Sequence, residues 1–127
     1  MQKTWVWVNI LGMKIERPIN TKKEGTVEIL VYKEKGAFVG VCLTFDIIEE
    51  GTDALSVLRS IKEATQLHLN TVIKNNMSDD LLNRYAPQEY WEKYFEVTKK
   101  IQTASLKKST NYAIVSPYHS SVVSEFA

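Results

Sequence analysis

Residues 27–45 have the sequence VEILVYKEKGAFVGVCLTF, and this stretch decides the fold. Side chains alternate along two runs, as is typical of β-strands with two different faces. The first run alternates Val27, Ile29 and Val31 with Glu28, Leu30 and Tyr32, and the second places Ala37, Val39, Val41, Leu43 and Phe45 on one face. Between the runs lies Glu34-Lys35-Gly36, where a glycine at the third position suits left-handed backbone. The stretch therefore predicts an antiparallel hairpin with a three-residue turn.

The segment after the hairpin predicts a short strand and a long helix. Residues 47–50 suit a third strand, which Gly51 ends. Asp53 is a good helix N-cap, because its carboxylate can accept hydrogen bonds from free backbone N–H groups one turn further on. An apolar stripe at helical spacing follows, formed by Ala54, Val57, Leu58, Ile61, Ala64, Thr65, His68 and Val72. We expect this helix to end near Asn75-Asn76.

The C-terminal third predicts two further helices and a last strand. Ser78 resembles a second N-cap, followed by acidic residues in the first turn. Pro87 is expected to break that helix and to start another, which runs to about Gln102. Residues 111–115 suit a last strand, which Pro117 is expected to stop. The order of these elements predicts an α+β domain.

The chain divides into four predicted segments. Residues 1–12 are interpreted as an N-terminal extension, because Met13 opens a segment that resembles a natural start. Alternation of Trp5 and Trp7 with Val6 and Val8 would suit an added strand. Residues 13–77 form the α+β core, residues 78–115 a helical extension with the last strand, and residues 116–127 a serine-rich tail that is expected to fray.

Composition limits the class of protein. A chain of 127 residues with 44% hydrophobic residues fits one globular domain that buries its own core. The net charge of +1 gives no general attraction to nucleic acid or membrane. No apolar stretch is long enough to span a bilayer. Cys42 is the only cysteine, so no internal disulfide forms and a cytoplasmic location is expected.

Residues 27–69 resemble the HicB family of antitoxin domains. The resemblance lies in the run Val31-Tyr32-Lys33-Glu34-Lys35-Gly36-Ala37-Phe38-Val39-Gly40-Val41-Cys42-Leu43, in Asp46-Ile47, in Glu50-Gly51-Thr52-Asp53 and in Ser60-Ile61-Lys62-Glu63-Ala64. The segment from Leu81 to Pro87, with Trp91 after it, is similar to an extension in some HicB-like proteins.

The resemblance implies a partial RNase H-like fold, β-β-β-α-β, without nuclease activity, and here an additional C-terminal helix. It also implies a partner, a small basic HicA-like toxin that cleaves messenger RNA and that the antitoxin silences by covering its active face. Many family members carry a C-terminal DNA-binding domain. Residues 78–102 depart from that pattern, because their acidic residues outnumber the basic ones and Glu89 and Glu92 would face the phosphates. We therefore expect no DNA binding.

No set of residues predicts catalysis, a metal or a cofactor. Pairing across a three-residue turn puts Glu28 opposite Cys42 and leaves Asp46 about 13 Å from Glu28, too far to share metal ions. The two histidines, His68 and His119, have no ligand at metal-binding spacing. His68 suits a partly buried structural position, and Cys42 a buried small hydrophobe. We expect a protein that is not an enzyme.

The predicted partner-binding residues lie on the hairpin and the third strand. They are Lys33, Glu34, Lys35, Phe38, Asp46, Glu49 and Glu50. The aromatic face formed by Tyr90, Trp91, Tyr94 and Phe95 is the alternative, although packing against the sheet or the first helix is favoured for it. Self-association into a dimer, through a strand edge or the aromatic helix, is also expected. Two other functions stay open: a stand-alone homo-oligomeric structural domain without a toxin, and a domain that binds RNA or a small ligand.

Overall fold

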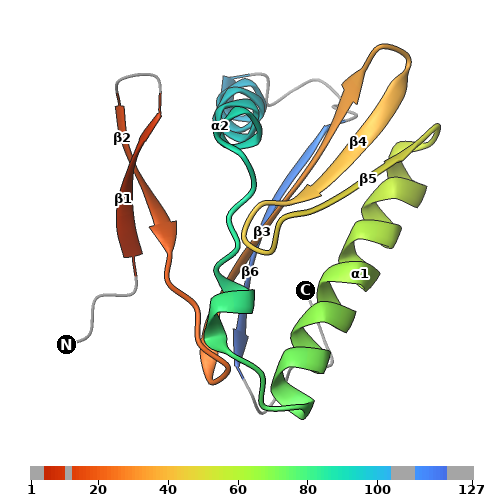
Figure 1. Cartoon of the computed structure of the whole chain (residues 1–127). Helices are drawn as coiled ribbons and strands as arrows, with labels where there is room; N and C mark the ends of the chain where they lie inside the picture. Colours follow the sequence, from red (N-terminus) through yellow and green to blue (C-terminus); the bar gives the residue numbers. More distant parts are fainter. Residues whose placement is uncertain (1–4, 11–12, 104–110, 120–127) are drawn as a thin grey trace.

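The computed structural model of the chain describes residues 5–10, 13–103 and 111–119, and it confirms the α+β class (Figure 1). A sheet of four strands has the order β5-β4-β3-β6, and all neighbouring strands are antiparallel. The elements are β3 (Glu24–Glu34), β4 (Ala37–Cys42), β5 (Ile47–Gly51), α1 (Ala54–Lys74), the 3-10 turn η1 (Asp79–Leu82), α2 (Gln88–Thr103) and β6 (Tyr112–His119). Helix α2 comes before the last strand, in the order that the sequence predicted for the helix after Pro87 and the strand at residues 111–115.

Two further strands form a separate hairpin near the N-terminus. Strand β1 (Trp5–Ile10) pairs with β2 (Met13–Pro18), with Trp5 opposite Pro18 and Ile10 opposite Met13. The strand predicted from the tryptophan and valine alternation is present, but it does not join the four-stranded sheet. The sequence suggested a segment boundary after residue 12, but strands β1 and β2 pair with each other across that point.

Each face of the four-stranded sheet packs against one helix, so the core has two halves. On the α2 face, Leu30 and Tyr32 of β3 and Val39 and Val41 of β4 pack with Trp91, Tyr94 and Val97 of α2. On the α1 face, Val27, Ile29 and Val31 of β3 pack with Val57, Ile61, Leu69 and Val72 of α1. Both faces of β3 are thus buried, which explains its nearly continuous apolar sequence.

The hairpin turn is shorter than predicted. Glu34 pairs with Ala37, so the loop contains only Lys35 and Gly36, whose φ angles are 50° and 80°. Two consecutive left-handed residues are typical of a type I′ turn, which matches the twist of the flanking strands. The prediction of a three-residue turn was wrong, and the register moves by one residue, with Ile29 opposite Cys42.

Strand β4 is also shorter than predicted. It ends at Cys42, and residues 43–46 form a turn in which Asp46 has a φ of 57°. Leu43 packs on the α2 face, whereas Phe45 packs on the α1 face, 4.9 Å from the His68 ring. The expectation that both would share one face was wrong, because the turn interrupts the strand alternation.

The helix boundaries follow the predicted capping residues. Asp53 accepts a hydrogen bond from the backbone N–H of Ser56 at 2.9 Å, and α1 ends at Lys74 with Asn75 as its C-cap. Ser78 caps the next element in the same way, through a 3.2 Å hydrogen bond from Asp80 N. That element is a single 3-10 turn, η1, so the full helix predicted there was wrong. Helix α2 begins directly after Pro87.

Strand β6 runs through Pro117 to His119, so the prediction that Pro117 stops the strand was wrong. Proline is tolerated at the edge of a sheet, where its missing N–H faces away from the neighbouring strand. Part of the predicted tail, residues 116–119, is therefore strand, and residues 120–127 lie outside the described residues. Within the described residues, no helix is long and apolar enough to cross a membrane.

Gly40 allows α1 to lie close to the sheet, and its replacement by alanine is expected to destabilise the protein. A Cβ atom at position 40 would lie 2.7 Å from Val57 Cγ1, which is too close for two carbon atoms. We expect Gly40→Ala to lower the free energy of unfolding by about 1–3 kcal/mol, measured by urea denaturation. Adding Val57→Ala should recover part of this loss in a double-mutant cycle. Additive effects of the two substitutions would contradict the steric explanation.

Candidate functional site

Three carboxylates gather around one aromatic side chain at the turn end of the sheet. Tyr32 lies on the α2 face, and its pKa is raised to about 12, first by burial and then by Glu34, Tyr90, Glu89 and Glu50. These neighbours come from three elements: β3, β5 and the first turn of α2. All three carboxylates are exposed. We call Tyr32, Glu34, Glu50, Glu89 and Tyr90 the Tyr32 site.

One lysine borders the Tyr32 site. The Lys93 ammonium lies 5.4 Å from the centroid of the Tyr32 ring, within the range of a cation–π interaction. Lys93 also contacts Glu96, with Nζ 3.8 Å from Oε2. Of the five residues that define the Tyr32 site, three are acidic and none is basic, while Lys33 and Lys35 flank Glu34 in the sequence and Lys93 lies at the border.

The predicted partner-binding residues do not form one surface. Lys33, Glu34 and Lys35 lie at the turn end of the hairpin. Asp46 lies beyond the other end of β4, about 20 Å away at the usual rise per strand residue. Of the predicted residues, the structure brings Glu34 and Glu50 together at the Tyr32 site.

Lys33, Phe38 and Glu49 lie on the α1 face of the sheet. Lys33 is opposite Phe38, which is partly buried against the α1-side core. Glu49 is opposite Gly40, and Glu50 is opposite Val39, so the two neighbouring glutamates point to opposite faces. Glu49 lines a groove of about 460 Å³ between β5 and the start of α1, together with Glu50, Gly51, Ser56, Val57 and Ser60.

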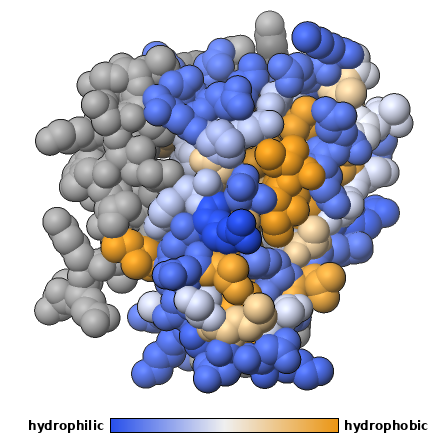
Figure 2. Space-filling model, viewed as in Figure 1, coloured by the Kyte–Doolittle hydropathy of each residue, from blue (hydrophilic) through white to orange (hydrophobic). Residues whose placement is uncertain are grey.

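Hydrophobic side chains reach the surface beside these acids. Ile48 of β5 is 43% exposed, although its strand neighbours are half-buried or charged. Figure 2 shows a hydrophobic patch over strands β4 and β5 with hydrophilic residues around it. The edge of the sheet therefore offers both apolar and acidic groups.

The alternative aromatic face is largely part of the core. Trp91 is fully buried and Tyr94 is 8% exposed, and their rings meet edge to face with centroids 6.3 Å apart. Tyr90 and Phe95 are partly buried against the same cluster. This is the packing that the sequence favoured for these residues.

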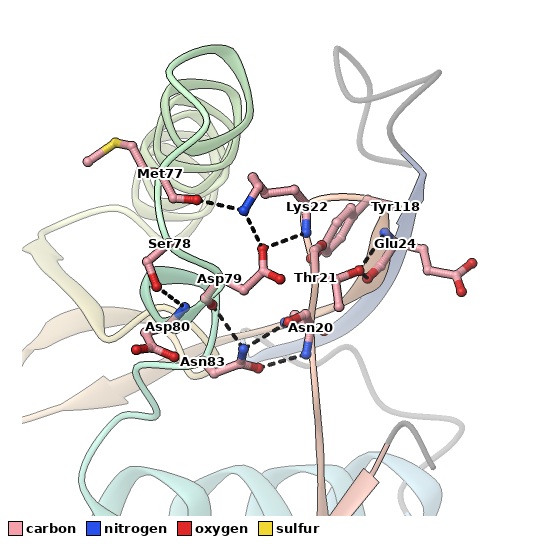
Figure 3. Close-up of polar contacts among 10 residues, drawn as sticks. All are labelled: Asn20, Thr21, Lys22, Glu24, Met77, Ser78, Asp79, Asp80, Asn83 and Tyr118. Carbon is pink, nitrogen blue, oxygen red and sulfur yellow. Dashed lines mark hydrogen bonds and ion pairs between the residues drawn. The ribbon is translucent and has the colours of Figure 1, made fainter. Parts of the chain in front are cut away.

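A polar network that sequence reasoning missed joins two distant segments, residues 20–26 and residues 82–83, and Figure 3 shows its contact between Asn20 and Asn83. The side chain of Asn20, 1% exposed, donates to Thr26 O and Leu82 O at 2.9 and 3.0 Å and accepts from Thr26 N at 2.9 Å. Asn83 Nδ2 donates to Asn20 O at 2.8 Å, and Asn20 N donates to Asn83 Oδ1 at 2.7 Å. We call these four residues the Asn20 network. No local sequence signal marks the contacts of Asn20 with Leu82 and Asn83, because they span more than 60 positions.

A partly exposed charged pair and a buried phenol extend this network. Lys22 Nζ lies 2.8 Å from Asp79 Oδ1, and its hydrogen bond lowers the pKa of Asp79. The Tyr118 hydroxyl donates to Thr21 O at 2.7 Å. These contacts fix the start of β3 against η1 and the end of β6 (Figure 3). Their role is therefore to position the sheet and the connection between the two helices.

The cysteine and the described histidine on α1 occupy structural positions. Cys42 is fully buried, and burial raises the pKa of its thiol to about 11, which leaves it protonated near neutral pH. His68 Nε2 donates to Leu81 O at 2.7 Å and is partly buried. In the described part of the chain, no three His, Cys, Asp or Glu residues lie close enough to hold a metal ion.

Comparison of the chain with protein-family models, with curated proteins and with solved structures gave no match. The structure shares the α+β class with the HicB-like expectation, and three strands, a helix and a further strand occur in the expected order. The insertion of α2 between α1 and β6 is the main difference.

Proposed function

We propose that this chain is a non-catalytic binding domain of the HicB antitoxin type, which neutralises a small basic toxin by covering its active face. The observation that carries the proposal is the convergence of Glu34, Glu50 and Glu89 around Tyr32. The three glutamates lie on β3, β5 and α2, so the packing of these elements brings their backbone positions to one end of the sheet. A protein that binds and cleaves RNA needs a basic face for the phosphates, and that face is complementary to such an arrangement.

Electrostatic complementarity of this kind acts mainly on the rate of association. Such attraction is screened over a Debye length of about 8 Å at physiological salt, so it weakens as the salt concentration rises. The exposed carboxylates should thus accelerate the encounter, while Tyr90 supplies partly buried aromatic area for the contact. The competing hypotheses are a stand-alone homo-oligomeric structural domain without a toxin, and a domain that binds RNA or a small ligand.

To test the proposal, the chain is co-expressed with the small basic protein that we expect a neighbouring gene to encode, and the rate at which the two proteins associate is measured. Replacement of Glu34, Glu50 and Glu89 by lysine should lower the association rate constant by about tenfold or more and weaken its salt dependence, as measured by stopped-flow fluorescence. The matched control is Glu63→Lys, an exposed residue on the outer side of α1, which should change the rate by less than about twofold.

Two outcomes would contradict the proposal. The first is that no small basic protein is encoded nearby and that the chain recovered from its host carries no partner. The second is a complex whose association rate is the same with the triple variant and with the control. The first outcome would favour the stand-alone oligomer.

A further inference from the structure

The two edges of the four-stranded sheet differ in what they offer to another strand. Backbone groups in an antiparallel sheet alternate between one neighbour and the other along each strand. Leu43 N donates to Glu28 O, so the backbone of Glu28 faces β4, and that of Ile29 faces Ile114 of β6. The same alternation turns the backbone of Ala113, Val115 and Pro117 away from the sheet. Because Pro117 has no N–H, the β6 edge lacks a donor where an added strand would need one.

The β5 edge keeps its donors and acceptors. By the same alternation, the backbone of Gly40 in β4 forms hydrogen bonds with that of Glu49 in β5, and the backbone of Cys42 does so with that of Ile47. The N–H and C=O groups of Ile48 and Glu50 therefore point away from the sheet. No strand among the described residues pairs with this side of β5. An extended chain could form hydrogen bonds to these four groups without any change in the sheet.

The side chains along β5 specify the chemistry of that added strand. Glu49 Oε2 is buried and accepts no hydrogen bond from the described residues, and it lines the groove beside Ser56 and Ser60. Glu49 is partly buried as a residue, and its shielded oxygen is open to a hydrogen bond from a donor that enters the groove. On the other face, Ile48 is 43% exposed and Glu50 belongs to the Tyr32 site.

We infer that β5 pairs with an extended segment of a basic partner, in which a lysine or arginine enters the groove and donates to Glu49. On the opposite face of the added strand, an apolar residue covers Ile48 and a second basic residue meets Glu50. Backbone pairing gives the affinity in this mode of recognition, and the alternate side chains give the specificity. The inference rests on the proposed function, because it names the segment that the basic partner contributes.

A second copy of the chain fits the β5 edge poorly. Two copies related by a twofold axis at Glu49 place the two Glu49 side chains opposite each other. An axis at Glu50 does the same with Glu50, and an axis at Ile48 places Glu50 opposite Asp46. Like charges directly opposite in a sheet are destabilising. Repulsion between the acidic side chains therefore disfavours self-pairing at this edge, and their negative charge favours a partner strand with basic residues.

The probe for this inference is an acetylated heptapeptide, Thr-Thr-Lys-Lys-Val-Thr-Thr, titrated into the full chain labelled with ¹⁵N. Binding should move the amide signals of Ile48 and Glu50 most, since these N–H groups gain hydrogen bonds. N-methylation of the first lysine and the valine leaves the charges unchanged and blocks the backbone pairing. It should weaken binding at least tenfold. Glu49→Gln should weaken binding of the unmodified peptide about fivefold, and the matched Glu63→Gln should leave it unchanged.

Three results would overturn the inference. They are equal affinity of the methylated and unmethylated peptides, no binding of either peptide, and signal changes confined to β6 or α1. Each is distinct from failure of the proposed function, which is judged by the protein partner and by the Glu34, Glu50 and Glu89 variant. A chain that takes up its protein partner but not the peptide loses only the β5 inference. A chain that binds the peptide at β5 but has no protein partner loses the proposed function.

Discussion

Replacement of Glu28 by glutamine is expected to stabilise the protein above pH 7 and to remove most of the pH dependence of its stability between pH 5 and 8. Glu28 lies on the α2 face of β3 and is 5% exposed. Burial raises the pKa of its carboxyl group from 4.5 to about 7. Its negative charge also contributes to raising the pKa of Tyr94 to about 12. A buried carboxylate of this kind costs free energy whenever it is ionised.

The sign of the effect follows from the two pKa values. Well below pH 4.5 the carboxyl is protonated in both the folded and the unfolded state, so it contributes no penalty. As pH rises to about 7, the unfolded state loses its proton first, and folding becomes less favourable by about 3 kcal/mol in total. Glu28→Gln should therefore gain about 2–3 kcal/mol at pH 8 and little at pH 4.5, measured by urea denaturation. Glu24→Gln, at an exposed position of the same strand, is the control and should keep the pH dependence. An equal gain at both pH values would contradict this explanation.

The second large effect is expected from Asn20→Asp. The Asn20 amide nitrogen donates to Thr26 O and Leu82 O. Aspartate would place an oxygen with negative charge about 3 Å from both carbonyl oxygens, in a position that is 1% exposed. We expect a loss of about 4 kcal/mol in the free energy of unfolding at pH 7, because two donors become repulsive acceptors.

Measuring the stability of Asn20→Asp at several pH values distinguishes the effect of the added negative charge from the effect of a changed hydrogen-bond geometry. Protonation of the aspartate at low pH removes the charge and restores one donor, so part of the lost stability should return as pH falls toward 4. Asn75→Asp is the matched control, since Asn75 Nδ2 also donates to a carbonyl oxygen, that of Thr71 at 3.0 Å, but at an exposed position. Its loss should stay below about 1 kcal/mol. Equal losses in the two variants would show that burial of Asn20 does not matter.

Local signals in the sequence predicted the parts of the fold that depend on a few neighbouring residues. The caps at Asp53 and Ser78, the end of α1 near Asn75 and the start of α2 after Pro87 all lie where expected. Each cap reflects a side chain that accepts a hydrogen bond from a backbone N–H within one turn. The start of α2 reflects a proline, which has no N–H that needs a partner in the first turn. The core position of Trp91 was also the favoured interpretation.

The features that were wrong or missed depend on parts of the chain that lie far apart. Pro117 ends a strand in the middle of a sheet but not at an edge, and the edge position of β6 comes from tertiary structure. The turn was misjudged because Lys35 adopts a positive φ that its residue type does not predict. The Tyr32 site needs β3, β5 and α2 together, so only two of its acids, Glu34 and Glu50, were among the predicted residues.

The position of β6 in the sheet has a consequence for the order of folding. Strands β3, β4 and β5 with α1 are consecutive in the chain and make short-range contacts, whereas Val31 pairs with Tyr112 about 80 residues later. Closing so long a loop loses entropy before the contacts form, so β6 should dock late on the folding pathway. Until then, the backbone groups of Val27, Ile29 and Val31 form an unpaired apolar edge. Aggregation during refolding should therefore depend on how fast β6 pairs with β3. Variants in which this pairing is slower should precipitate at a lower protein concentration than the parent protein.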